Sequence, residues 1–212
     1  MVAAGRAPNI ESLNLESAGI EVGRRGVSVD DHLRTANHRV FAVGDVASRW
    51  QFTHAADALA RIALQNAFFL GRKRESALAM PWCTYTDPEV AHVGLYEREA
   101  KERGLAVQTF TVPLAEVDRA VLDDEAEGFA RIHVGKRGKI LGGTLVSAHA
   151  GETISELSLA ITAGLSMADL ARTIHPYPTQ AEALKRAADA WSRARLTPRT
   201  KGLLQRFIRW RR

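Results

Sequence analysis

The amino-acid sequence predicts an α+β fold in which helices cover one side of an antiparallel sheet. Polar and apolar residues alternate over residues 105–113 and 129–134, and residues 139–147 continue the pattern, as in strands with one buried face. The last two segments are joined by Gly-Lys-Arg-Gly at residues 135–138, which is typical of a hairpin connection that needs a positive φ. Apolar residues at helical spacing predict three helices in the same region, over residues 97–103, 151–163 and 178–192.

The N-terminal part of the chain has a different pattern. About the first 35 residues are rich in glycine and predict irregular chain with one small strand near Val27 to Val29. Residues 39–45 form a continuous apolar run that ends in Gly-Asp, which predicts a short strand buried on both faces. Apolar residues then recur at spacings of three and four, so residues 54–71 should form an amphipathic helix closed by Gly71.

Charge and proline mark the expected boundaries. A charged stretch at residues 72–75 precedes Pro81, and the pattern changes after it. We therefore expect an N-terminal region over residues 1–79, a second domain over residues 80–192 and a basic tail over residues 193–212. The formal charge is +5, and it is concentrated in the tail, which argues against nucleic-acid binding across the whole protein.

Composition excludes several other classes. The chain is 46% hydrophobic, enough to bury a core, yet no apolar run approaches the ~18 residues that span a bilayer. The start lacks the apolar stretch of a secretory signal, so we expect a cytoplasmic protein. Cys83 is the only cysteine and lies beside Trp82 in an apolar segment, which predicts an inert buried thiol and excludes an intrachain disulfide. The histidines show no ligand spacing, so no metal site is expected.

A candidate ligand edge lies where the apolar run ends. Gly44 and Asp45 follow the expected strand, and a carboxylate there can accept hydrogen bonds from the hydroxyl groups of a ligand, although a plain turn aspartate is an equal alternative. Phe52, His54 and Ala55 then open the expected helix, whose N-terminal amides favour anionic or electron-rich ligand atoms. His54 could contact that ligand, but an exposed helix-start histidine is the more common role.

These segments resemble the flavoproteins with two dinucleotide-binding domains, the family of mercuric reductase, dihydrolipoamide dehydrogenase and glutathione reductase. Gly5 to Asn9 looks like the segment that closes the family's NAD(P)H-binding domain, and Val40 to Asp45 looks like its second FAD motif. Pro81 to Gly94 is similar to the start of the dimerisation domain, and Gly151 to Leu157 resembles its interface helix. The resemblance implies FAD as cofactor, with Gly44, Asp45, Phe52, His54 and Ala55 at its site, and NAD(P)H as co-substrate.

The stretch from His175 to Glu182 resembles the family's His-x-His-Pro-Thr-x-x-Glu segment. Aligned on Pro-Thr, Tyr177 stands where the catalytic histidine usually stands, and Glu182 matches the glutamate that orients it, while His175 falls two residues earlier. Mercuric reductases also carry tyrosine here, so the resemblance favours their branch and names Tyr177 and Glu182 as catalytic candidates. A phenol with a pKa near ~10 is suited to positioning a substrate rather than to shuttling protons. An interface aromatic and a surface carboxylate are the structural alternatives.

The expected function is that of the C-terminal part of an FAD-dependent, NAD(P)H-oxidising disulfide oxidoreductase. The sequence contains no Gly-x-Gly-x-x-Gly loop and no paired cysteines, so we do not expect the chain alone to be catalytic or to hold FAD tightly. The alternative is a stand-alone dimerisation module without redox activity. In both cases we expect a homodimer, formed around an apolar helix face that includes Ile154, Leu157, Ala160 and Ile161.

The tail predicts an amphipathic helix that starts near Pro198. We expect its apolar stripe to pack on the protein's own body, with an anchor to a membrane surface or to an acidic partner as the less favoured alternative. The stripe consists of Leu203, Leu204, Phe207, Ile208 and Trp210.

Overall fold

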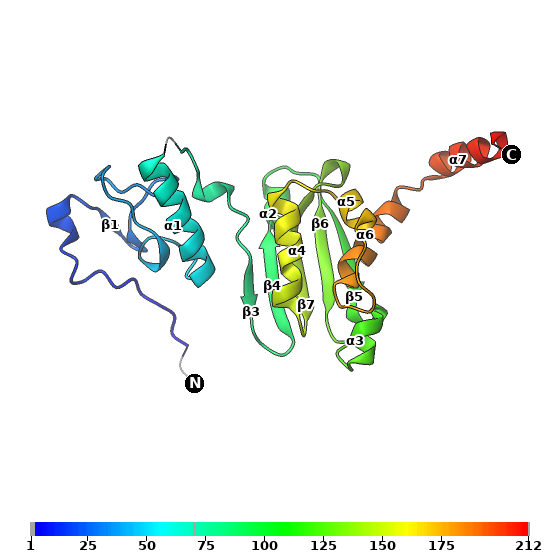
Figure 1. Cartoon of the computed structure of the whole chain (residues 1–212), viewed down its shortest axis with the longest axis horizontal. Helices are drawn as coiled ribbons and strands as arrows, with labels where there is room; N and C mark the ends of the chain where they lie inside the picture. Colours follow the sequence, from blue (N-terminus) through cyan, green and yellow to red (C-terminus); the bar gives the residue numbers. More distant parts are fainter. Residues whose placement is uncertain (1–2, 70, 212) are drawn as a thin grey trace. The chain divides into compact units, whose positions relative to one another are not determined.

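The computed structural model describes residues 3–69 and 71–211, without the side chains of residues 199, 203 and 204. The chain divides into two compact units, residues 1–78 and 79–212, and each is described by itself (Figure 1).

The first unit is built around one long helix, α1, over Thr53–Phe68. The buried core of this unit contains Leu33, Leu59, Ile62 and Ala63. The expected helix is therefore confirmed, and it ends slightly before Gly71. The rest of the unit consists of short elements: the 3₁₀ helices η1 (Leu15–Ala18), η2 (Gly44–Val46) and η3 (Glu75–Ala77), and an antiparallel pair of strands, β1 (Val22–Gly23) and β2 (Gly26–Val27).

The strand expected over residues 39–45 is not formed, and this prediction was wrong. The segment makes an isolated antiparallel bridge between Arg34 and Phe41, and the chain turns into η2 at Gly44. A strand needs a neighbouring strand along its length, and among the described residues this segment finds only the short stretch around Arg34. Its apolar side chains are used differently, because Phe41 and Val43 pack half-buried against the core below α1.

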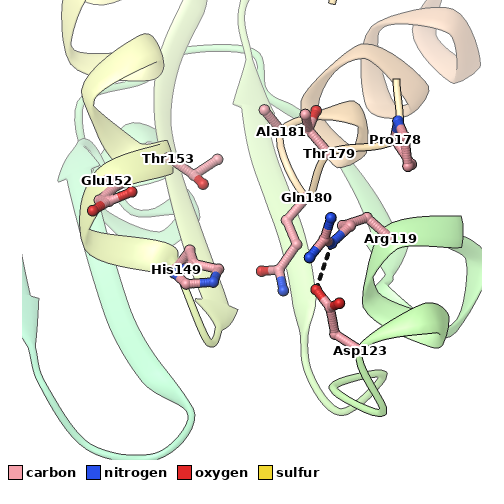
Figure 2. A pocket seen from close by; sticks show the side chains of 9 residues that line it. All are labelled: Arg119, Asp123, His149, Glu152, Thr153, Pro178, Thr179, Gln180 and Ala181. Carbon is pink, nitrogen blue, oxygen red and sulfur yellow. Dashed lines mark hydrogen bonds and ion pairs between the residues drawn. The ribbon is translucent and has the colours of Figure 1, made fainter. Parts of the chain in front are cut away.

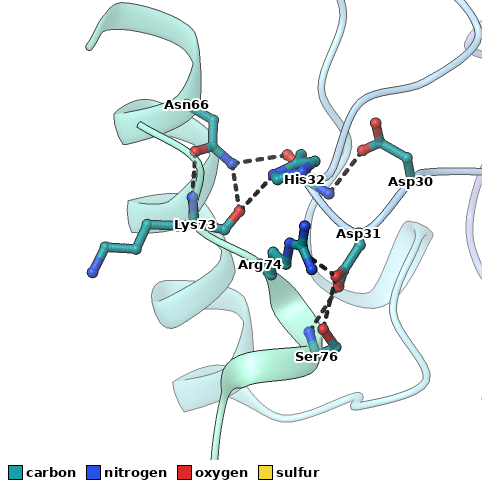
Figure 3. Close-up of polar contacts among 7 residues, drawn as sticks. All are labelled: Asp30, Asp31, His32, Asn66, Lys73, Arg74 and Ser76. Carbon is teal, nitrogen blue, oxygen red and sulfur yellow. Dashed lines mark hydrogen bonds and ion pairs between the residues drawn. The ribbon is translucent and has the colours of Figure 1, made fainter. Parts of the chain in front are cut away.

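Polar contacts tie the segment before the apolar run to the segment after α1 (Figure 3). The Asn66 side chain donates to the carbonyl oxygens of His32 and Lys73 and accepts from the Lys73 amide at 3.0 Å. Asp31 accepts from the Ser76 amide at 2.8 Å and from the Ser76 hydroxyl at 2.7 Å. These two bonds are the main reason that the pKa of Asp31 lies below its usual value. The hydrogen bonds of Asn66 and Asp31 therefore fix the positions of these loops.

The second unit contains a five-stranded antiparallel sheet in the order β3-β4-β7-β6-β5. This confirms the predicted fold class, and the strands near residues 129–134 and 139–147 lie where the alternation placed them. The strands are β3 (Trp82–Thr84), β4 (Glu89–Gly94), β5 (Gln108–Pro113), β6 (Phe129–Val134) and β7 (Ile140–Ser147).

One face of this sheet is buried beneath the helices. Strand register aligns Ala91, Leu145, Ala130 and Val112 across four neighbouring strands, and all four side chains are buried. Helix α4 (Ala150–Thr162) covers β4 and β7, and helix α6 (Glu182–Ala194) covers β5 and β6 on the same face (Figure 1). A Cβ on Gly143 would lie 2.5 Å from Leu157 of α4, so glycine allows the helix to approach the sheet closely.

The helices differ from the prediction in detail. Helix α2 (Glu97–Glu102) and α4 match it, whereas α6 begins at Glu182 and leaves residues 178–181 as a loop. Two short helices that the sequence did not predict, α3 (Asp118–Leu122) and α5 (Met167–Arg172), lie in the connections. In the hairpin connection, the positive φ angles fall on Arg137 and Gly138, where a Cβ on the glycine would collide with Trp191.

The basic tail forms helix α7 over Pro198–Trp210, with the Thr197 side chain accepting from the Thr200 amide. The helix is confirmed, but the expected packing is not. Phe207, Ile208 and Trp210 are 51%, 53% and 80% exposed in the chain. The parts of that prediction that concern the side chains of residues 203 and 204 lie outside the described residues. Within the described parts of the chain, no helix is both long and apolar enough to cross a bilayer.

Two histidines are buried on the other face of the sheet. His92 stacks on Tyr96 with 3.7 Å between ring centroids, and its nitrogens face the Thr144 hydroxyl and the Gly94 carbonyl. His133 bonds to the hydroxyl of Thr109 at 3.0 Å. Burial lowers the pKa of both imidazoles below their usual value near 6.5.

The two histidines should make the second unit sensitive to mild acid. Their folded-state pKa values are lowered, so between about pH 7 and pH 5 the unfolded chain takes up protons that the folded chain resists. We expect the melting temperature to fall across this range and the fall to be smaller in His92→Gln and His133→Gln variants. Carboxylates with lowered pKa values change the stability only below this pH range. If the melting temperature depends on pH identically in both variants and in the unaltered chain, the two histidines are not the cause of the acid sensitivity.

Candidate functional site

The first group of candidate residues lies at the start of η2 and α1. Gly44 adopts a φ of 74°, and a Cβ there would lie 3.3 Å from the Cβ of Ala56 in α1. Glycine therefore brings the turn directly against the first turn of the helix. Asp45 follows with its side chain 44% exposed, and its Oδ2 lies 3.1 Å from Nη1 of Arg6. The structure thus places an accessible carboxylate beside a helix N-terminus.

The first turn of α1 brings the other candidates next to Asp45. Phe52 precedes the helix in an extended conformation, and its side chain does not cap the first turn. The rings of Phe52 and His54 stack with 5.2 Å between centroids, while Ala55 is fully buried against the core. The residues predicted for the ligand edge are therefore brought together. Helix-start amides beside an exposed carboxylate can bind a ligand that carries both hydroxyl groups and electron-rich carbonyl groups.

The second group of candidate residues lies in the loop before α6, in the other unit. The Tyr177 hydroxyl donates to Oδ2 of Asp118 at 2.8 Å, and the other oxygen of Asp118 lies 3.6 Å from Nη2 of Arg186. Arg186 in turn contacts Oε1 of Glu182 at 3.0 Å. Tyr177 and Glu182, both predicted from the sequence, are thus joined through two residues that were not predicted.

The contact with Asp118 changes the acidity of Tyr177. The hydrogen bond to Asp118 raises the pKa of the phenol above its usual value, and the nearby carboxylate charge adds to the effect. The phenol therefore keeps its proton near neutral pH. Tyr177 is 69% exposed, so its ring can contact a substrate or a second protein surface while its hydroxyl stays oriented.

Glu182 and His175 are more enclosed than Tyr177. The Glu182 side chain is 19% exposed, and its Oε2 is buried with no hydrogen-bond partner among the described residues. The His175 side chain is 5% exposed and lies with Nε2 2.9 Å from Oε1 of Glu156 in α4. His175 therefore anchors the loop to α4 and does not reach the Tyr177 hydroxyl, which agrees with its place two residues earlier in the motif.

A pocket of about 260 Å³ opens beside the same loop (Figure 2). Arg119 of α3 and Asp123, which directly follows that helix, form an ion pair at 2.6 Å on one side, and the first turn of α4 lies opposite. Between them, the Gln180 amide nitrogen donates to Glu125 at 2.8 Å, and its carbonyl oxygen is buried without a partner among the described residues. The pocket has both charges on its wall, and residues 178–181, which directly follow Tyr177, line it.

The remaining candidates are consistent with a structural role. Cys83 is half-buried, and burial followed by the charge of Glu89 raises the pKa of its thiol, which keeps it protonated. Among the described residues, no three His, Cys, Asp or Glu side chains gather to hold a metal ion.

Sequence reasoning missed Arg6, Asp118 and Arg186. Arg186 stands four residues after Glu182, so helical spacing could have indicated that pair. Asp118 lies 59 residues before Tyr177, and Arg6 lies far from Asp45 along the chain, so no local pattern signals either contact.

Comparison with known protein families gives two matches. Residues 80–188 match the family described as pyridine nucleotide-disulphide oxidoreductase, dimerisation domain. The chain belongs to this family. Residues 1–60 match a second description, pyridine nucleotide-disulphide oxidoreductase. The predicted family and the predicted dimerisation domain are confirmed.

The individual relatives are named either mercuric reductase or dihydrolipoyl dehydrogenase. The chain is 40% identical to mercuric reductase from Staphylococcus aureus over 89% of its own length and 35% of the relative. It is 39% identical to mercuric reductase from Streptomyces lividans, over 91% of the chain and 41% of the relative. Dihydrolipoyl dehydrogenase from Geobacillus stearothermophilus is 35% identical over 89% of the chain and 40% of the relative. The chain therefore spans about two fifths or less of the curated relatives that it matches.

Solved structures agree with the fold. LpdA from Mycobacterium tuberculosis superposes with a TM-score of 0.82 at 28% identity, over 88% of this chain and 41% of that chain. The HOCl-induced flavoprotein disulfide reductase RclA from Escherichia coli gives 0.80 at 29% identity, over 88% of this chain and 44% of that chain.

The Tyr177–Asp118 contact generates a direct prediction. Replacing Asp118 by Asn removes the negative charge that helps to raise the pKa of the phenol, so the pKa of Tyr177 should fall toward that of an ordinary tyrosine. Ultraviolet titration of tyrosinate absorbance measures this shift, and Tyr177→Phe identifies which step of the titration belongs to Tyr177. If that step has the same midpoint with and without the Asp118→Asn change, the contact has no electrostatic role.

Proposed function

We propose that the chain forms part of a cytoplasmic, FAD-dependent oxidoreductase that oxidises NAD(P)H, in which it supplies one edge of the flavin site and the dimerisation domain. The family match over residues 80–188 carries this proposal. The arrangement at Asp45 and α1 supports it, because that edge has the chemistry a flavin nucleotide requires. The chain corresponds to a minority of the length of its relatives, so the complete reaction needs residues that this chain does not contain.

The residues at the first site fit FAD. The exposed Asp45 carboxylate is placed to accept hydrogen bonds from cofactor hydroxyls, and the backbone amides in the first turn of α1 are placed to donate to an electron-rich carbonyl. Gly44 keeps the turn close to α1 so that both groups act on one ligand. Bound FAD supplies the ring that accepts a hydride from NAD(P)H. The chain's own residues hold and orient that cofactor.

At the second site, Tyr177 orients the electron acceptor and does not act as the main proton shuttle. Its raised pKa keeps the hydroxyl protonated, and its exposed ring is available for contact. The resemblance to mercuric reductases suggests that one subunit presents Tyr177 to the flavin and dithiol of the other. Glu182, which is bound to Arg186, positions the start of α6 and the loop that carries Tyr177.

The dimer requires a different surface from the one expected. Ile154, Leu157 and Ala160 face the chain's own sheet and are buried, so they are not available to a second subunit. The outward face of α4 carries Ser155, Leu159 and Thr162 at helical spacing, with Leu159 67% exposed. We infer that two copies of this chain meet across that outward face.

Replacing Asp45 tests the flavin edge in the full-length enzyme. Asp45→Ala should weaken flavin retention about ten- to a hundredfold, because a charge-assisted hydrogen bond contributes about 1.5–3 kcal/mol. Flavin released on dilution measures the effect. Asp57→Ala removes another exposed carboxylate of the same region and should change nothing, and Arg6→Ala separates cofactor binding from the Asp45 ion pair. Unchanged retention in Asp45→Ala would remove the residue from the site.

The spectrum of the same preparation tests the overall function. Flavin absorbance that is bleached by NADH or NADPH supports the oxidoreductase. A colourless dimer that neither nucleotide changes would instead indicate the stand-alone dimerisation module.

Two leucines of α4 form a matched pair for testing the dimer. Leu159→Arg places a charge on the outward face, so light scattering should show a monomer that still unfolds cooperatively, at a melting temperature lowered only by the loss of association. Leu157→Arg buries a charge in the core and should unfold the second unit, since Leu157 is fully buried. A Leu159→Arg protein that remains dimeric would exclude this face as the interface.

A further inference from the structure

Helix α7 carries an apolar surface that the described chain leaves uncovered. Phe207, Ile208 and Trp210 are each at least half exposed, and the rings of Phe207 and Trp210 lie 6.2 Å apart between centroids. At 100° per residue these three positions span about 160° of the helix circumference. An isolated exposed leucine is ordinary on a protein surface, but three large apolar side chains on one arc give this helix an exposed apolar side.

The opposite arc of α7 is cationic. Lys201, Arg206 and Arg209 occupy it together with Gln205, and no acidic residue follows Asp189 in the sequence. Arg211, next to the end of the helix, lies with its guanidinium 5.7 Å from the centroid of the Phe207 ring. Basic side chains beside an apolar arc can reach anionic groups while the aromatic rings are buried below them.

The tail is also separate from the part of the chain that the family explains. The dimerisation-domain match ends at residue 188, ten residues before α7 begins at Pro198. The function proposed above uses none of the residues of α7. A surface outside the shared domain, apolar on one arc and cationic on the other, therefore needs a partner of its own.

We propose that α7 binds an anionic lipid bilayer surface and lies in the plane of its headgroups. The apolar arc enters the boundary between headgroups and acyl chains, and the cationic arc pairs with lipid phosphates. A nucleic acid would pair with the cations and could stack a base on an aromatic ring, but it would leave Ile208 in water. Packing against the described residues of this chain would cover these side chains, and they are exposed. The lipid surface is the partner that satisfies both arcs together.

Vesicle flotation with the full 212-residue chain tests this proposal. The chain should float with phosphatidylcholine vesicles that contain about 30% phosphatidylglycerol, much less with pure phosphatidylcholine, and less as salt is raised. The double variant Phe207→Ser, Ile208→Ser should bind at least about tenfold more weakly, because it removes two apolar side chains from the arc. Arg206→Glu with Arg209→Glu should abolish the preference for the anionic lipid.

A matched control uses exposed apolar residues elsewhere. Leu64 and Phe68 of α1 are 56% and 77% exposed, and replacing both with Ser should leave vesicle binding unchanged. Three results would overturn the proposal: no flotation of the unaltered chain with anionic vesicles, equal losses in the α1 control, or binding to an RNA oligonucleotide that competes fully with vesicles and survives the Phe207→Ser, Ile208→Ser changes. A lower melting temperature of the chain truncated after Ser192, combined with no flotation of the intact chain, would assign α7 to packing instead.

Discussion

The second unit depends on burying one face of its five-stranded sheet. The strand register brings small and branched apolar residues from four strands onto that face, and α4 and α6 are held there because their own apolar faces are buried against it. The remaining features follow from this arrangement. The chain must cross between the two helices after α5, and that crossing is the loop that carries His175, Tyr177 and Gln180. Core packing therefore sets where this loop runs, and polar contacts fix its ends and orient its side chains.

These polar contacts join residues that are separated by very different lengths of sequence. Glu182 and Arg186 are joined within one helix, while Tyr177 and Asp118 are joined between a loop and the distant helix α3. In the first unit, Arg6 similarly reaches Asp45 from a distant segment. Exposed ion pairs of this kind stabilise a fold only weakly. Their main effect is orientation, since each fixes the direction of a carboxylate or a phenol that the proposed chemistry uses.

The sequence predicted the elements that have a clear period. The alternation at residues 129–134 and the helical spacing in α1 and α4 each reflect one buried face, so their positions were confirmed. It failed at residues 39–45, where an apolar run without a neighbouring strand packs on a helix instead. It also assigned Leu157 to a partner surface, because an apolar stripe indicates that a face is buried but does not indicate what buries it. The Asp118 contact could not be predicted, since it depends on the tertiary fold.

The anchoring of the Tyr177 loop has a thermodynamic consequence. His175 fixes its start to Glu156 of α4, Gln180 fixes its end to Glu125, and the Tyr177 hydroxyl is itself bound to Asp118. The hydrogen bond to Asp118 thus restricts the orientation of the exposed ring already in the isolated chain. Ordering a side chain on association costs about 0.5–1.5 kcal/mol, so a ring that is already ordered loses little entropy when another surface meets it. Contact with Tyr177 should therefore favour fast recognition with little rearrangement of the loop.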